Sequence, residues 1–125
     1  MSNRLRHVRP AIRRLSATEA EVWLLVEPEW ITPTTEVRGR LVGPHCPGAS
    51  TVEVAYALRP FPQLPEGVPP LSRCVIIPEP SLWEPGQTYS YQAIVELWEG
   101  GRLCDRAQFE YGLRMGRGSP EVGSV

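Results

Sequence analysis

Two alternating segments near the end of the chain are separated only by a Gly-Gly pair, and they constrain the fold more than any other feature. The first spans 88–99 and reads TYSYQAIVELWE, and the second spans 102–114 and reads RLCDRAQFEYGLR. Successive side chains point to opposite faces of a strand, so each segment would have one apolar face and one polar face. Two glycines between such segments are typical of a two-residue β-hairpin turn. The sequence therefore predicts an antiparallel hairpin with one buried face.

The buried face of this hairpin would be formed by every second residue. The side chains expected to point inward are those of Tyr89, Tyr91, Ala93, Val95, Leu97, Leu103, Ala107, Phe109, Tyr111 and Leu113. Trp98 falls on the opposite face, which is an unusual position for so large an apolar ring.

Five shorter segments upstream also have the character of strands, and turns rich in glycine and proline separate them. They span 11–19, 20–28, 35–43, 50–60 and 71–79. No window keeps a helical period over three turns. Seven strand candidates at this spacing predict an all-β fold, an immunoglobulin-like antiparallel β-sandwich of about seven strands. We expect the sandwich to occupy residues 11–114.

The two ends of the chain are expected to lie outside the sandwich. We interpret residues 1–10 as a basic N-terminal arm and 115–125 as a flexible C-terminal tail. All thirteen cations of the chain are Arg, and the first fourteen residues hold five of them and no acid. Such an arm could bind phosphates or acids, but a solvated tail is our interpretation. Removal of residues 1–9 should then leave the domain folded.

Composition excludes several kinds of partner. A net charge of -1 gives the molecule no strong field for a nucleic acid or a membrane surface. Cys46, Cys74 and Cys104 are an odd count at wide spacing, which fits a reducing cytosol better than a disulfide scaffold. No apolar run is long enough for a membrane span or a signal peptide. We expect a cytoplasmic protein with no nucleic-acid or membrane partner.

A proline-rich corner precedes the hairpin. It reads PEPSLWEP over 78–85 and places Trp83 between Pro80 and Pro85. A ring at such a corner can cover the open end of a sandwich core and bury about 200 Å². The flanking prolines leave its backbone little entropy to lose. We therefore expect Trp83 to be structural.

The corner and the hairpin together resemble the end of the immunoglobulin-like sandwich domain of family-two glycoside hydrolases, the β-galactosidase and β-glucuronidase group. The matching positions are Leu82, Trp83, Pro85, Tyr89, Gly101, Asp105 and the run 111–114. The strand candidates upstream match this family only in their spacing along the chain. The resemblance implies structural roles for Trp83, Tyr89, Asp105, Tyr111 and Arg114.

The same resemblance implies that the domain is not catalytic. In that family the two catalytic Glu residues lie on a (β/α)₈ barrel that follows the sandwich, and such a barrel needs about 250 residues. Only 115–125 follow the matched run here, and the jelly-roll domain that precedes the sandwich in the family is not recognised. We expect no enzymatic activity and no cofactor.

The sequence gives little support for a catalytic site or a metal site. The acids occupy turns and polar faces, without the close pair in a cleft that a retaining glycosidase needs. A zinc site would require His45 and Cys46 to converge with Cys74 or Cys104 from separate segments. We expect no catalytic residue and no metal site.

Two functions remain, and Trp30, Trp98 and Glu96 are the candidate binding residues for both. Each Trp stands beside acids near a turn, an arrangement that could stack a sugar ring or be covered by a loop or a partner chain. We predict a non-catalytic interaction module that mediates protein–protein association, as a homo-oligomer or in a larger assembly. The alternative is a carbohydrate-binding accessory module. An exposed platform of both rings would favour sugar, and burial of both in a symmetric contact would favour assembly.

Overall fold

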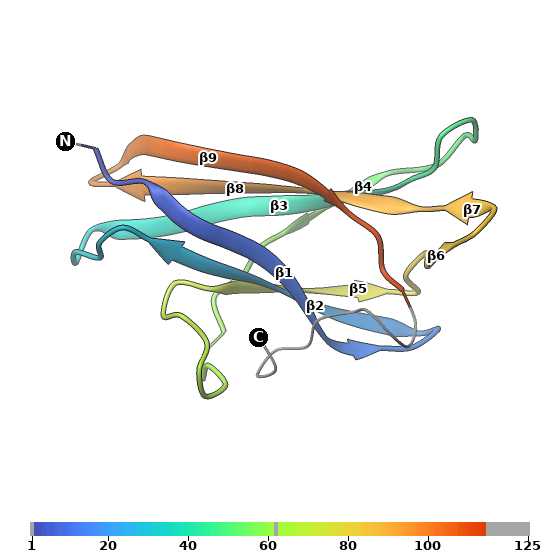
Figure 1. The fold of residues 1–125 in the computed structure, drawn as a ribbon, viewed down its shortest axis with the longest axis horizontal. Helices are drawn as coiled ribbons and strands as arrows, with labels where there is room; N and C mark the ends of the chain where they lie inside the picture. The colour runs from blue at the N-terminus through green and yellow to red at the C-terminus, as the bar shows by residue number, and fades with distance from the viewer. Residues whose placement is uncertain (1, 62, 115–125) are drawn as a thin grey trace.

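The computed structural model describes residues 2–61 and 63–114, and this part of the chain is an all-β sandwich without helices. Figure 1 shows the two sheets packed face to face. One sheet has the strand order β1-β2-β5 and the other β4-β3-β8-β9, while β6 and β7 form a separate two-stranded ribbon at one end. All strand pairs are antiparallel. The predicted all-β antiparallel sandwich is confirmed. The tail expected at 115–125 lies outside the described residues.

Most strand bounds follow the predicted segments closely, but the first strand begins before 11–19, the fourth is shorter than 50–60, and a short ribbon at 83–88 was not predicted. The strands are β1 (Leu5–Leu15), β2 (Glu19–Pro28), β3 (Thr35–His45), β4 (Val54–Ala57), β5 (Arg73–Pro78), β6 (Trp83–Glu84), β7 (Gln87–Thr88), β8 (Ser90–Glu99) and β9 (Arg102–Tyr111).

Strand β1 begins at Leu5, so most of the segment expected as an arm belongs to the sheet. It pairs with β2 from Leu5 opposite Pro28 to Leu15 opposite Ala20. Pro10 is accommodated in its middle because β1 is an edge strand, where one side of the backbone needs no sheet partner. The arginines that suggested a tail are instead exposed side chains of this edge. The sandwich therefore starts before residue 11.

The main core lies between the two sheets. The inward residues expected on the first half of the hairpin are buried from Tyr91 onward, whereas Tyr89 is half-buried just before β8. The buried members of this core are Ile12, Ala20, Val22, Leu24, Val26, Val37, Leu41, Leu58, Val75, Ile77, Tyr91, Ala93, Val95, Leu97 and Leu113.

A second, smaller cluster covers the outer face of β2. Trp23 is fully buried there, and its ring meets the ring of Phe61 edge-on, with centroids 5.2 Å apart. Phe61 belongs to the proline-rich connection between β4 and β5, and Leu64 and Val68 of the same connection also pack against this cluster. Because both faces of β2 are covered, its sequence is a continuous apolar run without alternation.

The last hairpin turns at Gly100 and Gly101, which have φ values of 53° and 80°, as the two-residue turn requires. Register then shifts by one residue: Leu97 lies opposite Asp105, but Trp98 lies opposite Leu103. Cys104 is the extra residue of this bulge. Leu103 therefore faces outward with Trp98 and is 50% exposed, so its expected inward position is wrong.

Candidate functional site

A polar cluster joins the start of the chain to the end of β8. The carboxylate of Glu99 accepts hydrogen bonds from Asn3 Nδ2 (3.2 Å), Thr32 Oγ1 (2.9 Å), Thr34 Oγ1 (3.1 Å) and Thr35 Oγ1. These donors, Thr35 first, lower the pKa of Glu99 from its ordinary value. Asn3 is buried and also donates to the carbonyl oxygen of Trp30 at 2.7 Å. All of these bonds hold the protein together locally and leave Glu99 poorly suited to act on a substrate.

Asp105 connects the edges of the two sheets. Its Oδ2 accepts a hydrogen bond from the backbone N–H of Leu5 at 2.8 Å, and its Oδ1 accepts one from the N–H of Arg106 at 2.8 Å. Because of the bulge at Cys104, Asp105 lies opposite the buried Leu97 and shares its inward face, on the side where Leu5 of β1 donates to it. The carboxylate therefore fixes the first strand against the last.

Trp83 lies against the end of β9. Its backbone N–H donates to the carbonyl oxygen of Leu113 at 2.7 Å, and the guanidinium of Arg114 lies over its ring. A Cβ atom at Gly112 would come within 2.8 Å of the ring atom Cδ1 of Trp83. Trp83 is half-buried, and the neighbour that packs on the main core is Leu82. We name Trp83, Gly112, Leu113 and Arg114 the corner clasp.

Three tyrosines lie near the same corner. Tyr91 is buried, and its hydroxyl oxygen accepts a hydrogen bond from the backbone N–H of Ser81 at 3.0 Å. Burial raises the pKa of Tyr91 and also that of Tyr111, which lies directly opposite on β9. Tyr89 is half-buried, and its backbone N–H donates to the carbonyl oxygen of Gln87.

Trp98 lies on the outer face of the four-stranded sheet. The guanidinium of Arg38 covers its ring at 4.3 Å from the centroid, and its Nε1 donates to Glu96 Oε1 at 3.3 Å. Arg38 is itself paired with Glu36 at 2.9 Å. The ring face on which a sugar could stack is therefore occupied by a cation from the neighbouring strand.

Trp30 lies in the connection after β2 and is 37% exposed. It borders a depression of about 540 Å³ shared with Val68 and Pro69, and another of about 450 Å³ shared with Arg102 and Leu103. Trp98 lines neither of these depressions. The structure thus does not bring the two predicted binding rings into one cleft.

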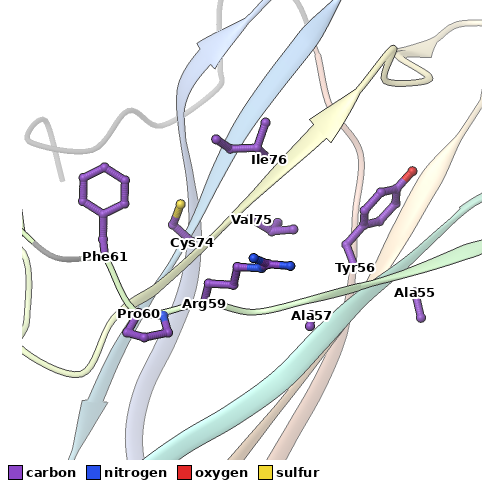
Figure 2. A pocket seen from close by; sticks show the side chains of 9 residues that line it. All are labelled: Ala55, Tyr56, Ala57, Arg59, Pro60, Phe61, Cys74, Val75 and Ile76. Atoms are coloured by element: carbon purple, nitrogen blue, oxygen red, sulfur yellow. The ribbon is translucent and has the colours of Figure 1, made fainter.

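A third cleft, of about 530 Å³, opens between the edge strands β4 and β5, and sequence analysis did not anticipate it. Figure 2 shows it with Tyr56 and Arg59 on one side and Val75 and Ile76 on the other. Its lining is Ala55, Tyr56, Ala57, Arg59, Pro60, Phe61, Cys74, Val75 and Ile76, with no carboxylate. These residues form no chemical motif along the chain, so only the juxtaposition of two sheet edges reveals the cleft.

Cysteine and metal chemistry are restricted in the part of the chain that the structure describes. The three cysteines are free, and burial raises the pKa of the Cys74 thiol to about 11. Residues 2–61 and 63–114 contain no group of three His, Cys, Asp or Glu side chains placed to hold a metal ion. They also contain no helix that is long and apolar enough to cross a membrane.

Comparison with known proteins yields one family. The family model of glycosyl hydrolases family 2 matches residues 48–114, which is more than half of the chain. This range includes the corner clasp and the last hairpin. No curated protein sequence matches the chain.

Several solved structures contain a similar sandwich. A β-glycosidase from Bacteroides vulgatus is 15% identical, with a TM-score of 0.59 over 90% of this chain and 13% of its own. The β-glucuronidase of Bifidobacterium dentium, complexed with coumarin-3-O-glucuronide, is 16% identical, with a TM-score of 0.58 over 90% of this chain and 18% of its own. The β-glucuronidase of Ruminococcus gnavus is 18% identical, with a TM-score of 0.58 over 92% and 16%. At such identities the likeness shows the fold, and the chain spans less than a fifth of each enzyme.

Proposed function

The chain belongs to family 2 of the glycosyl hydrolases, and from this premise we propose that it is a non-catalytic, immunoglobulin-like module that acts through protein–protein association. The strand order β1-β2-β5 against β4-β3-β8-β9 supports an immunoglobulin-like arrangement. Free cysteines without disulfides support a reducing compartment, and we propose the cytoplasm.

The arrangement of the carboxylates supports a non-catalytic role. Retaining glycosidases need two carboxylates about 5 Å apart in a substrate cleft. Here Glu99 is held by four side-chain donors, Glu21 accepts from the indole of Trp23, and Asp105 accepts from two backbone amides. The cleft between β4 and β5 is lined by no acid at all.

One observation carries the association proposal: the sandwich has an unprotected apolar edge. Val54 at the start of β4 is 45% exposed, Ile76 on β5 is 47% exposed, and Val52 just before β4 is 86% exposed. Strand β4 contains no charge and no proline. The edge of β1 carries arginines and Pro10, and β9 has a bulge, which are the usual protections against pairing. Exposed apolar groups gathered on an unprotected edge mark a contact surface.

A carbohydrate-binding role is the second candidate, and the exposure of Trp30 is what favours it. An aromatic ring beside Arg102 and the acceptors of Asn3 and Glu99 offers the stacking surface and polar groups that a sugar requires. Two observations argue against sugar binding. Arg38 covers the ring of Trp98, and the carboxylate of Glu99 already accepts hydrogen bonds from its neighbours.

The two candidates are separated by molar mass and fluorescence. Light scattering over a concentration series, with and without β-linked oligosaccharides, should show a discrete oligomer that sugars do not change. Trp98→Ala should keep the fold. A monomer whose tryptophan emission shifts with one glycan class, and loses that response in Trp30→Ala, would replace association by sugar binding.

A further inference from the structure

The cleft between β4 and β5 contains the side chain of one arginine. Figure 2 shows the guanidinium of Arg59 pointing into it. Within 2–61 and 63–114 this side chain forms no ion pair, hydrogen bond or ring contact. The lining includes no carboxylate, and burial raises the pKa of the Cys74 thiol to about 11, so this thiol is neutral near pH 7. The lining of the cleft therefore carries a positive charge.

The backbone at Arg59 is held by both sheets. The N–H of Leu58 donates to the carbonyl oxygen of Gly39 on β3 at 3.0 Å. The N–H of Arg59 donates to the carbonyl oxygen of Cys74 on β5 at 3.0 Å, and its carbonyl oxygen accepts from the N–H of Cys74 at 2.9 Å. The ring of the following Pro60 fixes its own φ. Because the base of the Arg59 side chain is already fixed, a ligand that binds the guanidinium loses less entropy.

The rest of the lining is mostly apolar. Tyr56 lies on one side of the cleft, and Val75 and Ile76 lie on the other. Phe61 adds a second aromatic ring, which is held by its edge-on contact with Trp23. The volume of about 530 Å³ lies within the range of roughly 300–1,000 Å³ that small-molecule sites occupy. Apolar walls with one well-placed polar group are typical of such sites.

We propose that this cleft binds a small organic carboxylate with an apolar body of one or two rings. The carboxylate would accept two parallel hydrogen bonds from the guanidinium of Arg59, because the two groups match in geometry. The rings would lie between Tyr56 and Ile76. One guanidinium balances one negative charge, so a monoanion suits the cleft better than a phosphate, whose further charge would remain unpaired against apolar walls.

Isothermal titration calorimetry of the full chain with butyrate, phenylacetate and naphthylacetate tests the proposal. Affinity should rise from butyrate to naphthylacetate, because each step buries more apolar surface. Naphthylacetamide has the same rings without the charge and should bind about tenfold more weakly. Amide chemical shifts measured by NMR during the naphthylacetate titration should change most around Ala57 and Ile76, which line the cleft.

Two variants test the role of Arg59. Arg59→Gln should bind naphthylacetate and naphthylacetamide with equal affinity. Ala57→Glu adds a carboxylate to the lining that competes for the guanidinium, and it should weaken naphthylacetate binding by about tenfold. Arg106→Gln on β9 changes an exposed arginine outside the cleft, so it is the matched control and should bind like the wild type. Thermal melts check that each variant is folded.

Three results would overturn the site: no binding of any of the three carboxylates, equal affinity of the wild type for the acid and the amide, or an Arg59→Gln variant that still prefers the acid. The site goes beyond the proposed association and does not depend on it. Light scattering without ligand measures association, so a monomer that binds naphthylacetate and an oligomer that does not bind it identify which of the two inferences fails.

Discussion

The guanidinium of Arg114 lies 3.8 Å from the centroid of the Trp83 ring, and the same ring occupies the space that a Cβ atom at Gly112 would need. Both contacts involve the run 111–114 that closes the sandwich. The family resemblance at these positions thus corresponds to a physical clasp between the proline-rich corner and the end of β9. A glycine is needed because any Cβ would come too close to the indole.

Gly112→Ala should lower the free energy of unfolding by about 1–3 kcal/mol, because the added methyl group must displace the Trp83 ring.

Trp83→Ala should lower the free energy of unfolding by about 2 kcal/mol. This is less than the 3–5 kcal/mol typical of a fully buried aromatic, because the ring is half-buried. Urea unfolding measures both. In the Trp83→Ala background, Gly112→Ala should become nearly neutral, and equal costs in both backgrounds would contradict the clasp.

Asp105→Ala should destabilise the protein by about 1–3 kcal/mol, because the N–H of Leu5 loses its acceptor. Hydrogen exchange should become faster at Leu5 before it changes in the centre of β2. Asp105→Asn keeps one carbonyl acceptor and should cost less. Unchanged exchange at Leu5 in Asp105→Ala would show that the bond does not hold β1.

Deletion of residues 1–9 should unfold the domain or destabilise it severely, contrary to the expectation from sequence. The deletion removes the buried Asn3 and the pairing of β1 with the second half of β2. Circular dichroism and a thermal melt of the truncated chain measure this. A deletion of Met1 alone is the control, and an unchanged melting temperature after removal of 1–9 would restore the arm interpretation.

Glu99 should make stability sensitive to acid. Hydrogen bonds, chiefly from Thr35, lower the pKa of Glu99 below its ordinary value of 4.5 in the folded state. The folded state then binds fewer protons, so the contribution of Glu99 is present above pH 4.5 and is lost as the pH falls through the folded pKa. Glu99→Gln should flatten this acid limb in urea midpoints measured against pH. An equally steep limb in that variant would contradict the assignment.

Cys74 should be the least reactive thiol of the native protein. Burial raises its pKa from an ordinary 9.0 to about 11, so little thiolate forms near neutral pH. The half-exposed Cys104 should react first with a thiol reagent, and Cys74 should react only after unfolding. Because folding raises the pKa of Cys74, the contribution of this thiol to the free energy of unfolding is fully present below pH 9.0. It is lost as the pH rises from 9.0 to about 11. Rapid labelling of Cys74 in the native Cys104→Ser variant would contradict this.

The sequence predicted best what depends on local pattern. The hairpin of β8 and β9 follows from alternation and the Gly-Gly turn, which is local information. Strand β1 was misread because an edge strand tolerates Pro10 and charged residues that a central strand would not. The outward position of Leu103 depends on a bulge, and a one-residue slip reverses every following face.

The candidate site depends on pairings that no local pattern encodes. Arg38 reaches Trp98 only because β3 and β8 lie side by side in a particular register. The cover that Phe61 gives Trp23 and the cleft between β4 and β5 likewise arise from segments far apart in sequence. The sequence therefore identifies the aromatic candidates but not the residues that contact them in the fold.

The bond between the amide of Leu5 and the carboxylate of Asp105 joins positions one hundred residues apart. The strand that begins the sheet therefore receives this anchor only after the final strand has been synthesised. Contacts of such long range slow folding, because the loop between them must close first. During translation β1 can pair with the neighbouring β2 early, whereas its anchor to β9 forms only when the last strand is in place.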